Sequence, residues 1–131
     1  MDHHANGSEI RMTLLAEPSS VVLTRELVRY ALGMWGFPQP LIEDSMPVMS
    51  EMVNNAVNAA RGHEIRARVA VCQGAPLLEC WDPSPELPQR RDALPDAEDG
   101  RGLTIIAAYA KDTGVRAAVG RGKVVWALMP A

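Results

Sequence analysis

The predicted fold is decided by one stretch of the chain, Ile65-Arg66-Ala67-Arg68-Val69-Ala70-Val71-Cys72-Gln73-Gly74-Ala75-Pro76-Leu77-Leu78-Glu79-Cys80-Trp81-Asp82. Near its start, apolar residues alternate with Arg66 and Arg68, which is typical of a half-buried β-strand. Residues 73–76 predict a turn, and residues 77–82 predict a second strand. We therefore expect the two strands to pair as a hairpin.

Upstream of this hairpin, the sequence predicts one strand and two helices. Residues 11–16 alternate as a strand, and the serines at positions 19 and 20 offer N-caps for a helix that ends between residues 33 and 36. The second helix is predicted to run from near Asp44 to residue 60, because Pro47 is tolerated only in a first turn. The first helix is expected to face the core with Leu23, Leu27, Tyr30, Ala31 and Met34.

Downstream of the hairpin, residues 83–102 hold four prolines and no periodicity, and they predict a long loop. Residues 103–111 predict a helix, and residues 115–119 and 123–129 predict a second hairpin. The predicted order, β-α-α-β-β-loop-α-β-β, joins consecutive strands as hairpins and disfavours a parallel doubly wound sheet. We therefore expect an α+β protein, a two-layer α/β sandwich whose mixed, mostly antiparallel sheet has its helices packed on one face.

The bulk composition fits a single globular domain. The chain has 131 residues, 47% hydrophobic and 22% charged, and we expect residues 1–10 to be a flexible tail and residues 11–131 to form the domain. The net charge of −3 gives no electrostatic reason to expect nucleic acid or an anionic membrane as a partner. With no signal-peptide pattern and no long apolar run, we expect a cytoplasmic protein in which Cys72 and Cys80 are buried, reduced thiols.

Glu51 and Asn55 are the first candidates for chemistry. Four residues apart on a predicted helix, they project in the same direction. A carboxylate can act as a general base, and an amide oxygen is a suitable ligand for Mg²⁺. The alternative interpretation is an ordinary solvated helix face.

Asp82 is the second candidate, since it ends an apolar strand. A carboxylate in this position could accept a hydrogen bond from an exocyclic amine such as that of adenine. Alternatively, Asp82 only begins the turn before Pro83.

The third candidate is the segment Gly100-Arg101-Gly102-Leu103, a glycine-rich loop that leads into a predicted helix. Glycines let backbone N–H groups approach phosphate oxygens, and a helix N-terminus favours negative charge. The segment lacks the Gly-Lys-Ser/Thr of a P-loop and does not follow a strand as a Rossmann motif does. The alternative is a flexible helix cap.

In combination and in this order, the three candidates resemble the Bergerat, or histidine-kinase-like, ATPase domain family. The resemblance spans about residues 11–130 and is closest to anti-sigma-factor serine/threonine kinases and their short actinobacterial ATP-binding relatives. It is carried by three strings, Ser50-Glu51-Met52-Val53-Asn54-Asn55-Ala56-Val57, Trp81-Asp82-Pro83-Ser84-Pro85 and Gly100-Arg101-Gly102-Leu103.

The resemblance implies ATP and Mg²⁺ as cofactors and a role for each matched residue. Asn55 corresponds to the Mg²⁺ ligand, Glu51 to the catalytic residue that activates the attacking hydroxyl, and Asp82 to the residue that reads adenine. Residues 83–102 correspond to the ATP lid and the glycine loop, and the lid itself covers residues 83–99. The implied phosphate contacts are Gly100, Arg101, Gly102 and Thr104.

The resemblance implies a serine/threonine protein kinase that phosphorylates a STAS-type anti-sigma antagonist and sequesters a sigma factor. It also implies a homodimer. The alternative is a catalytically weak or inactive nucleotide-binding module that regulates a partner by binding alone. Two departures from the family pattern favour this alternative. Pro83 and Pro85 stand in an adenine turn that is glycine-rich in many relatives, and Val124 and Val125 replace a threonine near the phosphates.

Overall fold

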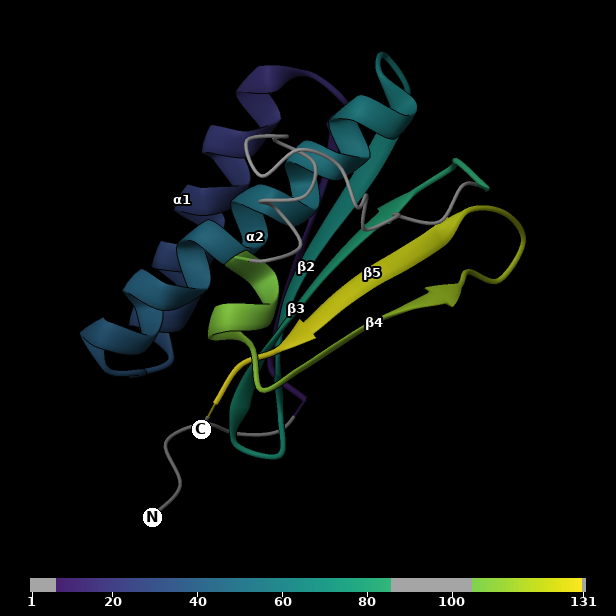
Figure 1. The fold of residues 1–131 in the computed structure, drawn as a ribbon. Coiled ribbons are helices and arrows are strands. Elements are labelled where there is room, and N and C mark those ends of the chain that lie inside the picture. Colours follow the sequence, from purple (N-terminus) through teal and green to yellow (C-terminus); the bar gives the residue numbers. More distant parts are fainter. Residues whose placement is uncertain (1–6, 86–104, 131) are drawn as a thin grey trace.

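The computed structural model describes residues 7–85 and 105–130, drawn in colour in Figure 1. The two helices are α1 (Pro18–Met34) and α2 (Gln39–Ala60), and residues 105–109 form a further helical segment. The strands, in sequence order, are β1 (Glu9–Leu15), β2 (Glu64–Cys72), β3 (Ala75–Asp82), β4 (Asp112–Ala117) and β5 (Lys123–Leu128).

The strands form a single five-stranded sheet in the order β1-β2-β3-β5-β4. All four strand pairings among the described residues are antiparallel, so the predicted mixed sheet is antiparallel throughout this part of the chain. Both predicted hairpins are confirmed. At the β2–β3 turn, Gln73 and Gly74 have φ of 54° and 77°, the left-handed pair that matches the twist of a two-residue hairpin.

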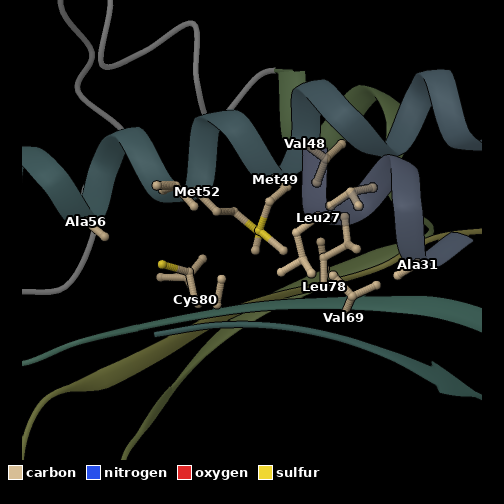
Figure 2. Close-up of a cluster of buried hydrophobic side chains, with 14 of the residues drawn as sticks. Leu27, Ala31, Val48, Met49, Met52, Ala56, Val69, Leu78 and Cys80 are labelled. Atoms are coloured by element: carbon tan, nitrogen blue, oxygen red, sulfur yellow. The ribbon is translucent and has the colours of Figure 1, made fainter. Parts of the chain in front are cut away.

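The two helices cover one face of the sheet, which confirms the predicted two-layer α+β sandwich (Figure 1). Strand residues at every second position face the helices. Figure 2 shows Met49 and Met52 of α2 directed at Leu78 and Cys80 of β3, and all four are fully or almost fully buried. Within residues 7–85 and 105–130, no helix has the length and apolar character needed to cross a membrane.

Helix α1 differs from its prediction at its start and in its buried face. Glu17 occupies the N-cap position without a side-chain hydrogen bond, Pro18 opens the helix, and the Ser20 hydroxyl donates to the carbonyl oxygen of Leu15 instead of capping. Three of the five residues predicted to face the core are exposed, because apolar residues occur on several sides of α1 and their spacing alone does not identify the packed side. The exposed residues are Leu23, Tyr30 and Met34.

Helix α2 begins at Gln39, well before the predicted start near Asp44, so Pro47 lies inside the helix. A proline there cannot donate the backbone hydrogen bond to the residue four positions earlier. The helix nevertheless continues through Pro47, because its buried face extends on both sides, from Ile42 to Ala60. The predicted start near Asp44 was therefore wrong, because burial along the helix outweighs the effect of the proline.

The strand boundaries differ from the predicted ones by at most three residues. Strand β1 starts at Glu9, inside the predicted tail, and β4 covers residues 112–117 in place of 115–119. The helix predicted for residues 103–111 is observed at 105–109, and positions 103 and 104 lie outside the described residues. Strand β5, the last in sequence, lies inside the sheet between β3 and β4.

The helix-free face of the sheet carries a chain of ion pairs across the strands. Arg68 of β2 contacts Glu9 of β1 and, at 2.7 Å, Glu79 of β3. Arg116 of β4 reaches the other oxygen of Glu79 across β5, also at 2.7 Å. Glu79 is buried beneath these arginines, and its carboxylate accepts a hydrogen bond from Arg68 and forms an ion pair with Arg116, so the buried charge is compensated on both sides.

The observed buried face of α1 predicts that leucine-to-alanine substitutions at positions 27 and 23 lower the free energy of unfolding by different amounts. Leu27 is 6% exposed and Leu23 is 51% exposed. We expect Leu27→Ala to lower the free energy of unfolding by about 2–5 kcal/mol through loss of burial and the cavity left behind. Leu23→Ala, the matched control, should cost less than about 1 kcal/mol. Urea unfolding followed by circular dichroism measures both, and equal losses would contradict the assigned face.

Candidate functional site

Glu51 and Asn55 lie in the C-terminal half of α2, and both are half-buried. The residue after each of them, Met52 and Ala56, points toward the sheet in Figure 2 and is buried. Because successive helical residues are rotated by about 100°, Glu51 and Asn55 lie on the flank of α2 beside its buried face. The predicted geometry, two polar side chains one turn apart on the same side, is therefore present.

Asp82 is the last residue of β3 and is 2% exposed. Its orientation follows from the strand period of two residues, because Leu78 and Cys80 face the helices and Asp82 is next in the same row. The carboxylate therefore lies on the helix-covered side of the sheet. Asp82 is thus a buried charged group as well as the start of a turn.

Lys123 is the direct cross-strand partner of Asp82. The register of β3 and β5 places the two residues opposite each other, and Lys123 starts the buried row that continues with Val125 and Ala127. The Lys123 Nζ lies 2.9 Å from Asp82 Oδ1, and the lysine is 4% exposed. A positive and a negative side chain are thus buried together at the end of the core.

Backbone groups of Ser84 complete the environment of this ion pair. The Ser84 amide donates to Asp82 Oδ1 at 2.8 Å, and Lys123 Nζ lies 3.4 Å from the Ser84 carbonyl oxygen. The amide contact forms a local turn in which the Asp side chain bonds to the backbone two residues on, a geometry compatible with Pro83. Charged groups withdrawn from water need such additional hydrogen bonds to offset the cost of desolvation.

The apolar core extends up to the ion pair through Cys80. Burial raises the pKa of the Cys80 thiol to about 12, and the negative charge of Asp82 acts in the same direction. The thiol therefore stays protonated near neutral pH and packs as a small apolar side chain. Both cysteines are free, as predicted, but Cys72 is only half-buried.

The turn between β4 and β5 is attached to the end of β3. The Trp81 indole N–H donates to the carbonyl oxygen of Arg121 at 3.0 Å, and the Arg66 guanidinium lies 4.3 Å from the centre of the Trp81 ring. Gly122 has a φ of 83° and packs so closely that an added Cβ would collide with the Asp82 carbonyl oxygen. Gly122 thereby allows the backbones of β3 and β5 to meet at the ion pair.

The structure describes three of the seven predicted site residues, Glu51, Asn55 and Asp82, and leaves their assigned roles as predictions. The other four lie outside the described residues: Gly100, Arg101, Gly102 and Thr104. Lys123 and Gly122 were not among the residues predicted from the sequence. Counting back by two from Ala127 and Val125 would have placed Lys123 on the buried side of its strand.

A family model described as the histidine kinase-like ATPase domain matches residues 14–129 of the chain. The matched region runs from β1 to the end of β5 and contains α2, Asp82 and Lys123. No curated protein matches the chain.

The close approach at Gly122 predicts that an alanine there destabilises the protein more than an alanine at Gly120. Gly120 also has a positive φ, 93°, but an added Cβ there meets no atom within 4 Å. We expect Gly120→Ala to cost about 1 kcal/mol for the left-handed backbone alone. Gly122→Ala should cost about 2–4 kcal/mol, because the collision with the end of β3 is added. Urea unfolding of both variants tests this, and equal costs would show that the contact yields readily.

Proposed function

The chain belongs to the histidine kinase-like ATPase domain family, and from this premise we propose that it is an ATP-binding regulator whose nucleotide site includes Asp82, Asn55 and the Gly100–Gly102 segment. The observation that carries the proposal is the buried carboxylate of Asp82 at the end of β3. A buried acceptor in this position suits the exocyclic amine of adenine.

The polar atoms of Asp82 fit this role. Oδ1 accepts hydrogen bonds from Ser84 and Lys123, whereas Oδ2 accepts none from any described residue. A carboxylate oxygen has capacity for a further donor, and the amino group of an adenine would supply it. The buried surroundings would strengthen such a hydrogen bond by excluding water.

The phosphate side of the proposed site would use Asn55. Its amide oxygen is a ligand type that Mg²⁺ accepts together with phosphate oxygens. A bound Mg²⁺ would neutralise charge that develops on the phosphates during transfer. Gly100, Arg101, Gly102 and Thr104 are proposed as phosphate contacts on the basis of the family resemblance alone.

We further propose that the protein is a serine/threonine kinase for a STAS-type anti-sigma antagonist and binds a sigma factor. In this proposal Glu51 is the general base that accepts the proton of the attacking hydroxyl. Its position one turn before Asn55, on the same flank of α2, supports the assignment.

A second candidate function is regulation by nucleotide or partner binding without phosphoryl transfer. Two observations favour it. The turn after Asp82 contains Pro83 and Pro85, and Asp82 already has a cationic partner in Lys123. Both features affect how the adenine ring would be held, and neither involves Glu51, the proposed general base. Nucleotide binding and phosphoryl transfer therefore need separate tests.

The nucleotide site is tested by calorimetry with ADP in the presence and absence of Mg²⁺. We expect the wild type to bind and Asp82→Asn to bind at least about tenfold more weakly, because the charged acceptor for the adenine amine is lost. Asp44→Asn, an exposed position on α2, is the matched control and should bind like the wild type. Circular dichroism confirms that each variant is folded. No binding by the wild type at millimolar ADP would contradict the proposed site.

The kinase assignment is tested by transfer of labelled γ-phosphate to candidate STAS proteins. We expect Glu51→Gln to keep its ADP affinity within about twofold and to slow transfer by about 10²–10⁴-fold, the usual contribution of a general base. Glu43→Gln, at an exposed position of the same helix, should transfer at the wild-type rate. Transfer that is unaffected by Glu51→Gln would refute the assigned base. Nucleotide binding without any transfer by the wild type would support the second candidate function.

A further inference from the structure

We infer that Lys123 is a base-reading residue of the proposed nucleotide site, where it donates a hydrogen bond to N1 of adenine while Asp82 accepts one from the adenine amine. This inference rests on the proposed function, in which Asp82 lies at the base. It assigns Lys123 a role beyond the neutralisation of Asp82.

The hydrogen-bonding capacity of the ion pair is not exhausted. An ammonium group has three N–H donors. One of those of Lys123 is directed at Asp82 Oδ1, at 2.9 Å, and another has only a long contact, 3.4 Å, to the Ser84 carbonyl oxygen. The third has no acceptor within the part of the chain that the structure describes. Together with Asp82 Oδ2, the pair offers one donor and one acceptor side by side.

This donor–acceptor pair is complementary to one edge of adenine. The amine at C6 donates, and the adjacent ring nitrogen N1 accepts. An isolated carboxylate would satisfy the amine only, and N1 would then need a water molecule or another donor. Lys123 lies in the same buried row as Val125 and Ala127, where an unsatisfied polar atom of a ligand would be costly. A lysine donor beside the carboxylate removes this cost.

A purely structural role for Lys123 makes a different prediction. If the lysine only compensated the charge of Asp82, the effect of removing N1 from the ligand would be the same with and without the lysine side chain. If the lysine donates to N1, the same removal leaves an ammonium N–H facing a C–H group. The ligand can therefore be changed at one atom while the protein keeps its natural ion pair.

The experiment compares ADP, 1-deaza-ADP and 7-deaza-ADP by calorimetry with the wild-type protein. We expect 1-deaza-ADP to bind at least about tenfold more weakly than ADP, as for loss of a hydrogen bond to a charged group. 7-Deaza-ADP, which lacks a nitrogen on another edge of the base, should bind within about twofold of ADP. Equal binding of ADP and 1-deaza-ADP would overturn the role of Lys123 and leave the proposed function intact. No binding of any of the three would overturn both.

The variant Lys123→Met assigns the effect to this side chain. We expect it to bind ADP and 1-deaza-ADP within about twofold of each other, whereas a variant that keeps the wild-type preference would overturn the inference. The control is Lys111→Met, which removes the other lysine of the chain, an exposed residue, and should keep the preference.

A second measurement needs no change at Lys123, which matters because Lys123→Met leaves a buried carboxylate without its partner. In Lys111→Met protein with ¹⁵N-labelled lysine, Lys123 is the sole lysine, so its ammonium signal is assigned at once. We expect ADP to shift this signal and 1-deaza-ADP at saturation to shift it much less. An unchanged signal at saturating ADP would overturn the inference.

Discussion

The register of β3 against β5 determines which residues of both strands reach the helices, and the core and the candidate site both depend on it. On β3 the helix-facing row runs through Leu78 and Cys80 to Asp82, and on β5 it begins at Lys123. A slip of β5 by one residue against β3 would turn Lys123 to the other face of the sheet and put Val124 in its place beside Asp82. The hydrophobic packing that fixes the register therefore also places the charges.

Much of the fold could be predicted from local patterns, because alternation and turn residues are properties of short segments. Both hairpins and a two-layer architecture with a mostly antiparallel sheet followed from such segments. The helices were less predictable, since their boundaries and faces depend on neighbours distant in sequence. Apolar residues on several sides of α1 concealed its buried face. Pro47 suggested a helix start, yet the burial along α2 outweighs the single backbone hydrogen bond that this proline removes.

Some residues of the candidate site could likewise be predicted from short motifs, whereas others depend on contacts between distant segments. Glu51, Asn55 and Asp82 could be selected because each belongs to a short motif with a family resemblance. Lys123 and Gly122 were missed because their importance arises only when β5 lies against β3. Lys123 lies on the buried side of its strand, at a position that ordinarily holds an apolar residue. Positions that break the local pattern in this way are hard to predict from sequence, and functional residues are often found at them.

The position of β5 within the sheet has a consequence for synthesis of the protein on the ribosome. Strands β1 to β3 can pair with one another as soon as they emerge, but β4 emerges before the strand that joins it to the sheet. Until β5 is made, one edge of β3 remains open and Asp82 lacks its counter-charge. A nascent chain thus exposes a pairing-competent edge beside an incomplete site, and such edges are prone to association with other chains.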